Sequence, residues 1–252
     1  MPVVLFASAP ALAETWAPGC EEAPSHVREV SGEAALLVGF APGFVPPFRA
    51  AERDRTAAGV AVSGWLGDRV RLSGEWEWLT DRTPAGETIS GPGDVRLGTA
   101  VRVVSFGPVR LGLGWEAKLP NATNENELGT DETDITFGAW ARLDRGPFRA
   151  GLAAGLGVLG NPLRYANQDD VPLLAADVGG AVAAWRVGGL VRAELPTARN
   201  PARVEAGARV RWGRRWFVEA EGATGLTPAA ADGRAVVRLG VAGSLPDPPV
   251  GE

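Results

Sequence analysis

The feature that most constrains this chain is a series of long runs in which apolar and polar side chains alternate. In the run from Val109 to Leu119, one face carries valine, leucine, tryptophan and alanine, while the other carries arginine, glutamate, lysine and glycine. A period of two with one apolar face is typical of a β-strand. At about 11 residues, the run is long for a soluble sheet and suits a tilted strand that crosses a bilayer.

The same pattern predicts further strands, and from residue 57 onward tight turns and longer loops alternate strictly between them. The candidate strands are Ala34–Ala41, Ala58–Trp65, Arg69–Leu79, Asp94–Phe106, Val109–Leu119, Asp134–Leu143, Phe148–Val158, Leu174–Ala184, Arg186–Leu195, Ala202–Trp212, Trp216–Ala223 and Gly233–Ser244. The longer loops are expected at 42–56 and near 80–93, 120–133, 159–173, 196–201 and 224–232. Tight turns at one end and long loops at the other are typical of outer-membrane barrels, whose tight turns are periplasmic. The even number of strands then puts both termini in the periplasm.

The fold class predicted from this organisation is all-β: a transmembrane, up-and-down, antiparallel β-barrel of about 12 strands. Alternation alone also fits a soluble β-sandwich, in which the charged face is solvated and the apolar face forms the core. The uniform strand length, the loop asymmetry and the small residues on the apolar face favour the barrel, since lipid does not require interlocking bulk. Tryptophans near strand ends or on apolar faces are predicted to form an interfacial girdle. They are Trp65, Trp76, Trp78, Trp115, Trp212 and Trp216.

Composition argues against several other classes of protein. No apolar run approaches the roughly 18 residues that a transmembrane helix requires. The net charge of −5 leaves no basic footprint, so no nucleic-acid partner is expected. The single cysteine, Cys20, excludes an intramolecular disulfide, and CxxC patterns are absent. The acidic loop Asn121–Asp134 does not have the spacing of a calcium-binding loop. No metal site and no cofactor is predicted.

Four regions are predicted along the chain. Residues 1–13 resemble the second half of a signal peptide, because a short apolar region precedes the A-x-A cleavage pattern Ala11–Ala13. Residues 14–33 are then a periplasmic N-terminal extension, residues 34–245 the β-barrel, and residues 246–252 a C-terminal tail.

The polar face of the predicted strands is rich in arginine and glutamate, and in a barrel this face lines the lumen. The predicted lumen-lining residues are Arg71, Glu75, Glu77, Arg96, Arg102, Arg110, Glu116, Lys118, Arg142, Arg149, Arg192, Glu194, Glu205, Arg209, Arg211, Glu219, Glu221, Arg234 and Arg238. Guanidinium groups that bridge carboxylates are expected to fill and brace a narrow interior. Because the positive groups outnumber the negative ones, a polar or anion-selective pathway is a second interpretation.

Enzymatic activity is not predicted, and no catalytic residue is assigned. The lipases, deacylases and proteases among outer-membrane barrels depend on a histidine as general base. The only histidine, His26, lies in the N-terminal extension and outside every predicted strand.

Three motifs between Ser90 and Asp134 carry a family resemblance. They are Gly91–Asp94 (GPGD), Lys118–Ala122 (KLPNA) and Gly129–Asp134 (GTDETD). The stretch resembles the outer-membrane β-barrel transporter family named for the phenol meta-cleavage degradation pathway, which is FadL-like in architecture and carries G-x-G-D, K-L-P-T-G and G-x-G-x-x-D at these places. Ala122 and Asp131 stand where that family has glycine. The resemblance implies an outer-membrane barrel that admits small, often hydrophobic molecules, with motifs that serve turn structure.

The predicted function is therefore a passive channel or transporter for small molecules, hydrophobic or aromatic ones included, in the outer membrane of a bacterial cell. Its expected partners are outer-membrane lipid and a small-molecule permeant that the sequence does not name. The alternative is a non-transporting barrel with a structural or surface-interaction role, whose lumen is closed by Arg/Glu pairs.

Overall fold

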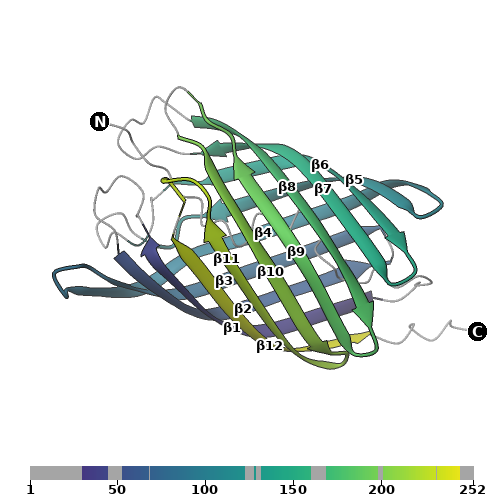
Figure 1. The fold of residues 1–252 in the computed structure, drawn as a ribbon, viewed down its shortest axis with the longest axis horizontal. Helices are drawn as coiled ribbons and strands as arrows, with labels where there is room; N and C mark the ends of the chain where they lie inside the picture. Colours follow the sequence, from purple (N-terminus) through teal and green to yellow (C-terminus); the bar gives the residue numbers. More distant parts are fainter. Residues whose placement is uncertain are drawn as a thin grey trace, which may run out of the picture.

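The computed structural model describes residues 30–44, 53–67, 69–122, 128, 132–159, 169–197, 201–230 and 232–244. These residues form twelve β-strands (Figure 1). The strands are β1 (Val30–Phe44), β2 (Arg53–Leu66), β3 (Val70–Arg82), β4 (Thr88–Phe106), β5 (Val109–Leu119), β6 (Asp134–Arg145), β7 (Phe148–Leu159), β8 (Asp169–Val182), β9 (Trp185–Glu194), β10 (Arg203–Gly213), β11 (Trp216–Gly225) and β12 (Gly233–Ser244). No described segment forms a helix long and apolar enough to span a membrane.

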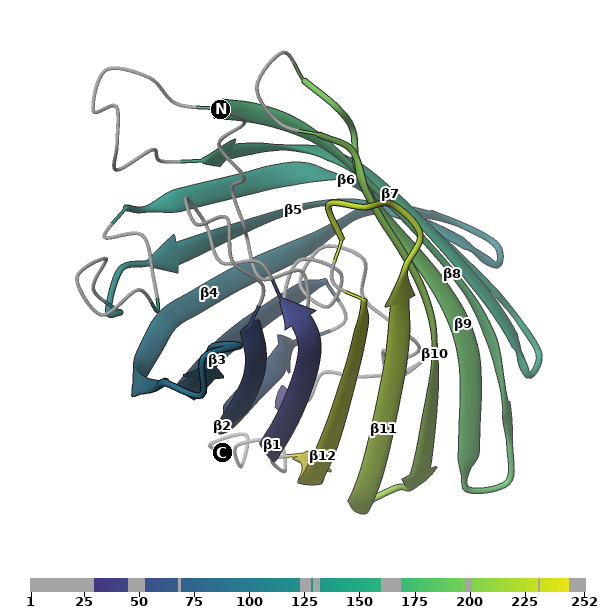
Figure 2. The same ribbon diagram turned by 60° about the vertical axis from the view of Figure 1, so that its left-hand side comes forward.

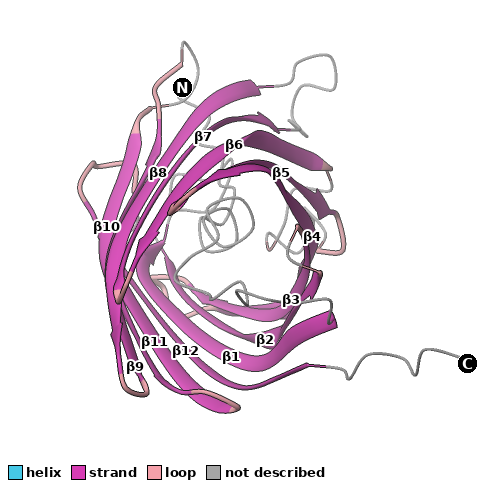
Figure 3. Cartoon of the chain, turned by 90° about the vertical axis from the view of Figure 1, so that its right-hand side faces the viewer, coloured by secondary structure: helices cyan, strands magenta, loops and turns pink. Residues whose placement is uncertain are grey.

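The strands close into a single barrel (Figure 3). Each strand is antiparallel to the next one along the chain, and β12 pairs with β1 in unbroken register from Ser31↔Ser244 to Phe40↔Ala235. Closure satisfies the backbone hydrogen bonds of the first and last strands, which would otherwise be open edges. The predicted fold class is thereby confirmed, and the soluble β-sandwich is excluded because its two sheets do not close.

Tight turns and longer connections alternate around the whole ring, as predicted, and they gather at opposite ends of the barrel (Figure 1). The turn between β4 and β5 is formed by Gly107 and Pro108, where Gly107 has a φ of 55° that suits glycine. Ala183, in the turn between β8 and β9, takes a similar φ of 56° although it carries a Cβ. We refer below to the turn end and the loop end.

Several strands begin earlier than their sequence pattern predicts. Residues 30–33, assigned to the N-terminal extension, form the start of β1. The predicted loop 80–93 is mostly hairpin, since Arg82 pairs with Thr88 (Figure 2). Opposite Trp76 and Trp78, β4 contains one extra residue, since Trp76 pairs with Val95 and Trp78 with Pro92. This bulge reverses which positions of β4 face inward, so the alternation in its sequence breaks there. The predicted signal peptide, the tail and the rest of the extension lie outside the described residues.

The outer face of the barrel is apolar and exposed. Leu36, Val103 and Leu152 are each more than half exposed. Large apolar side chains all round a closed barrel suit contact with hydrocarbon, not water.

Four of the tryptophans predicted to form the girdle are exposed: Trp78, Trp115, Trp212 and Trp216. Trp76 is half-buried. Trp65 departs from the prediction, because it is only 8% exposed and shares the inner face of β2 with Ala61 and Ser63. The run before it contains small residues on both faces, so the sequence does not show which face is inward.

Inside the barrel, two aromatic rings pack over glycines of neighbouring strands. A Cβ on Gly112 would lie 2.3 Å from both Trp140 Cζ2 and the carbonyl oxygen of Val101. A Cβ on Gly240 would lie 2.3 Å from Phe217 Cζ. Large inward side chains are therefore accommodated only because the facing position is glycine.

This packing makes Gly112 intolerant of substitution. We expect Gly112→Ala to lower the unfolding midpoint of the detergent-solubilised barrel, measured by heat-modified electrophoretic mobility. The cost should be about 1–3 kcal/mol, because the new methyl group overlaps both a ring and a backbone carbonyl. Gly243→Ala is the matched control, since a Cβ there would have nothing within 4 Å. Equal midpoints for the two variants would contradict this packing.

Candidate functional site: the charged interior

The residues predicted to line the lumen are all withdrawn from the exposed outer surface. Those that are buried are Arg71, Arg96, Glu116, Lys118, Arg142, Arg149, Arg192, Arg211, Glu219, Glu221 and Arg238. Those that are half-buried are Glu75, Glu77, Arg102, Arg110, Glu194, Glu205, Arg209 and Arg234. Charged groups are buried in proteins only when they are paired and hydrogen-bonded, so their partners define the character of the interior.

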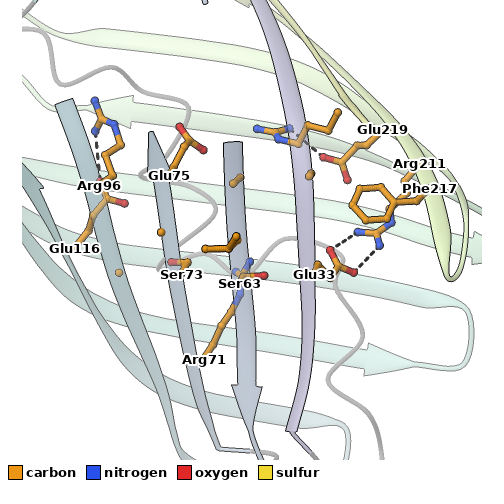
Figure 4. A pocket seen from close by; sticks show the side chains of 16 residues that line it. Glu33, Ser63, Arg71, Ser73, Glu75, Arg96, Glu116, Arg211, Phe217 and Glu219 are labelled. Atoms are coloured by element: carbon orange, nitrogen blue, oxygen red, sulfur yellow. Dashed lines mark hydrogen bonds and ion pairs between the residues drawn. The ribbon is translucent and has the colours of Figure 1, made fainter. Parts of the chain in front are cut away.

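A cavity of about 60 Å³ lies inside the barrel, between the inner faces of β1–β5 and β10–β12 (Figure 4). Its charged lining consists of Glu33, Arg71, Glu75, Arg96, Glu116, Arg211, Glu219 and Arg238. A water molecule needs about 10–15 Å³ of such space, so the cavity has room for a few waters or a small ion. Seven of these eight residues belong to the set predicted from sequence, and Glu33 does not.

Glu33 closes a contact across the seam where β12 meets β1. Arg211 of β10 donates from Nη1 to Glu33 Oε2 at 2.8 Å, passing over β11 and β12. On the way its Cζ lies 3.6 Å from the centre of the Phe217 ring, which gives a cation–π contact (Figure 4). Sequence reasoning placed Glu33 in the extension, although its parity with Ala35 and Leu37 on the inner face of β1 was a usable signal.

Two carboxylates each hold three arginines. Glu221 of β11 accepts from Arg192 at 3.1 Å, from Arg209 Nε at 2.8 Å and from Arg234 at 2.7 Å. At the turn end, Asp144 forms ion pairs with three others, at 3.2, 3.1 and 3.6 Å. They are Arg110, Arg142 and Arg149. The Asp144 cluster carries an excess of positive charge, which favours anions nearby. The arginines around Glu221 are balanced, because Arg209 also lies 3.8 Å from Glu219 and Arg234 lies 3.8 Å from Glu205. Asp144 was missed because its sequence position reads as part of a tight turn.

The residues of the three family-like motifs meet at the loop end. Lys118 Nζ lies 2.7 Å from Asp134 and 3.5 Å from Asp94, and all three side chains are nearly buried. Asp94 Oδ1 also accepts the backbone N–H groups of Asn121 and Ala122, at 3.1 and 3.0 Å. We call Asp94, Lys118 and Asp134 the clasp. It fixes the point where β5 leaves the barrel, which is a structural role.

Beside the clasp, the described part of the β5–β6 connection packs against the strands. Ala122 and Leu128 form a buried cluster with Leu79. A Cβ on Gly91 would lie 3.0 Å from Leu128 Cδ1, so the glycine of the GPGD motif makes room for that side chain.

One sector of the interior is apolar. Trp140, Ala153, Leu159, Val171 and Leu173, from β6, β7 and β8, form a buried cluster. The sequence did not predict it, because the start of β8 is apolar on both faces and gives no alternation. The interior is thus charged on most strands, and β6–β8 add an apolar patch beside the charged residues that β6 and β7 also carry.

The ion pairs described above run along the wall of the barrel. Neighbouring strands are joined by Arg96–Glu116 of β4 and β5 and by Arg203–Glu194 of β10 and β9. Among the pairs named here, Arg211–Glu33 spans the most strands, because β10 and β1 lie three places apart in the ring. None of the pairs named here connects opposite sides of the barrel, so they brace the wall without bridging the lumen.

Among the described residues, no three His, Cys, Asp or Glu side chains are grouped as metal ligands. His26 and Cys20 lie outside the part of the chain that the structure describes.

No protein-family model matches the chain, and no curated protein matches it. Solved structures do share its fold. An outer-membrane channel from Pseudomonas putida F1 is similar with a TM-score of 0.62 at 12% identity, covering 90% of this chain and 99% of the channel. The NanC porin gives 0.56 at 12% identity, covering 84% and 100%. The KdgM porin gives 0.53 at 9% identity, covering 86% and 99%.

At these identities the likeness is one of fold. The fold is that of outer-membrane barrel channels and porins. Together with the exposed apolar outer face, it is consistent with the predicted localisation in the bacterial outer membrane.

The clasp gives a stability prediction. Lys118→Met should destabilise the barrel strongly, by roughly 3–5 kcal/mol, because Asp94 and Asp134 would remain buried without their cation. Neutralising both acids as well, in Asp94→Asn/Lys118→Met/Asp134→Asn, should recover much of that loss. The measurement is the urea midpoint of unfolding in lipid vesicles. A triple variant no more stable than Lys118→Met would show that charge balance is not what the clasp provides.

Proposed function

We propose that this protein is a passive outer-membrane channel for small water-soluble molecules, with a preference for anions. The observation that carries the proposal is the arrangement of the interior charges. They pair along the wall of a closed barrel, and they surround a polar cavity with room for water. The residues predicted to line the lumen are assigned this role here.

The preference for anions follows from the Asp144 cluster, in which one carboxylate holds three arginines. The cluster lies at the turn end, on β6 and its neighbours β5 and β7. A solute that travels between the two ends passes this positive region. Positive potential in a low-dielectric passage concentrates anions and repels cations.

Two observations bear on the chemical nature of the permeant: the motif resemblance and the charge of the interior. Membership of the phenol meta-cleavage transporter family, with its FadL-like architecture, stays a prediction from motif resemblance and would imply hydrophobic or aromatic cargo. A neutral hydrophobic molecule would meet the charged wall along β9–β12 and β1–β5. The apolar cluster on β6–β8 offers it contact only in one sector. We therefore favour polar or anionic solutes. No catalytic role and no nucleic-acid partner is proposed.

The small size of the cavity also fits the alternative of a barrel that does not transport. At about 60 Å³ it is much smaller than a drug-sized binding site. A barrel with so narrow an interior could also serve a structural or surface role without transport, as the alternative from the sequence states.

Paired substitutions on β3 test the channel. Arg71 and Glu75 line the same cavity from the same strand. In planar bilayers under a KCl gradient, Arg71→Gln should lower the chloride-to-potassium permeability ratio and Glu75→Gln should raise it. The shift should be roughly two- to fivefold, the size expected for one charge a few ångströms from the ion path.

Arg82→Gln is the control, since Arg82 lies on β3 and is exposed. It should leave the ratio unchanged. No conductance from correctly folded wild-type protein would refute the channel and favour the closed barrel. Shifts of the same sign for Arg71→Gln and Glu75→Gln would refute the assigned ion path.

A further inference from the structure

The exposed charges of the barrel are distributed unevenly between its two ends. In the described ranges, the exposed charged side chains at the turn end are all arginines. They are Arg69, Arg145, Arg214 and Arg215. Those at the loop end are mostly acidic: Asp54, Arg82, Glu87, Asp170 and Asp232. Among the described residues, the exposed charge is therefore positive at the turn end and mostly negative at the loop end.

Three outward tryptophans lie on consecutive strands beside two of these arginines. Trp185 begins β9, Trp212 lies near the end of β10 and Trp216 begins β11. They are 51%, 51% and 74% exposed. Trp185 and Trp212 are register partners whose ring centroids lie 6.3 Å apart at 47°. We call Trp185, Trp212 and Trp216 the tryptophan patch.

The turn that carries the arginines is held in place on both sides. Arg214 and Arg215 connect β10 and β11 directly after Gly213, whose φ is 101°. Gly213 N–H donates to Ala184 O at 2.9 Å, and Ala242 N–H donates to Arg215 O at 2.7 Å. The β10–β11 turn is thus tied to the β8–β9 turn and to β12. The backbone that carries the two arginines is therefore held next to the tryptophan patch.

We propose that the tryptophan patch with Arg214 and Arg215 binds the head group of an anionic phospholipid in the leaflet at the turn end. Indole rings combine an apolar body with an N–H donor and concentrate at the boundary between hydrocarbon and head groups. Arginines beyond that boundary reach the phosphate oxygens, with a guanidinium fork that matches them. Because the rings face outward from the membrane-spanning wall, the occupant is a lipid and not a soluble anion.

The two other arginines at this end lack such a platform. Arg145 is followed, after the turn, by the single exposed ring of Phe148, and Arg69 has the aliphatic Leu66 nearby in the chain. They carry the same charge at the same end, so they separate a specific lipid site from general attraction to a charged membrane.

Native mass spectrometry of the full-length protein in detergent tests the proposal. The protein is titrated with phosphatidylglycerol and with phosphatidylcholine of equal chain length, and the two affinities are compared. Wild-type protein should prefer phosphatidylglycerol. Arg214→Ala/Arg215→Ala should reduce that preference by about tenfold or more, since each arginine near a lipid surface contributes about 1 kcal/mol.

Two further variants complete the experiment. Arg69→Ala/Arg145→Ala removes the same charge and should retain the preference. Arg214→Lys/Arg215→Lys keeps the charge without the guanidinium fork, so its preference should lie between those of the wild type and Arg214→Ala/Arg215→Ala. Heat-modified electrophoretic mobility checks that every variant is folded. Equal losses in Arg214→Ala/Arg215→Ala and Arg69→Ala/Arg145→Ala would overturn the site in favour of diffuse attraction by the rim. Loss in neither would also overturn it. The outcome does not depend on whether the barrel conducts ions.

Discussion

The pairing of β12 with β1 is the contact on which the rest of the structure depends. In hydrocarbon an unpaired backbone N–H or C=O has no water to bond, so a membrane-spanning sheet must have no edge. Here the two terminal strands pair from Ser31 to Phe40 without a register shift. The Arg211–Glu33 ion pair crosses this seam from the inside, with the Phe217 ring beneath it. Closure also separates two surfaces: an outer one that is apolar and an inner one that is charged.

Closure explains why so many charges are buried without a conventional core. Burying an isolated ion is costly, and a buried pair offsets that cost only with good geometry and further hydrogen bonds. The interior meets this requirement by sharing carboxylates, as Glu221 does among its arginines. Because the pairs named above follow the wall, they stiffen the barrel without themselves joining opposite strands. The same arrangement supplies both stability and the proposed ion path.

Much of the fold follows from side-chain alternation and loop length. The closed barrel of twelve strands, with tight turns at one end, was predicted from these two features, and the structure confirms it. The predicted strand boundaries are wrong where the alternation of apolar and polar side chains breaks down. The shift at Trp76 and Trp78 concealed the start of β4, and the apolar start of β8 concealed an inner cluster that includes Val171.

The ion-pair partners of the charged side chains were harder to predict than the strands. The charged residues expected inside are buried or half-buried, yet their pairing depends on the stagger between strands, which a sequence does not display. Glu33 and Asp144 were missed because each lies at a strand end, where the sequence pattern places Glu33 in the N-terminal extension and Asp144 in a tight turn. Trp65 was assigned to the girdle because it lies at a strand end. It lies on the inner face instead, which the small residues on both faces of the preceding run do not reveal.

Cysteine accessibility tests most directly whether the apolar outer face contacts lipid and the charged inner face contacts water. In a background with Cys20 replaced by serine, single cysteines would be placed at Ser63, Ser73, Val60 and Leu72. The protein would then be treated in lipid vesicles with a small, charged, water-soluble thiol reagent. Ser63 and Ser73 line the cavity, whereas Val60 and Leu72 are exposed on the outer face. Modification at Ser63 and Ser73, with protection at Val60 and Leu72, is the predicted result. The reverse pattern, or equal modification at all four positions, would contradict a lipid-facing outer surface around a watery lumen.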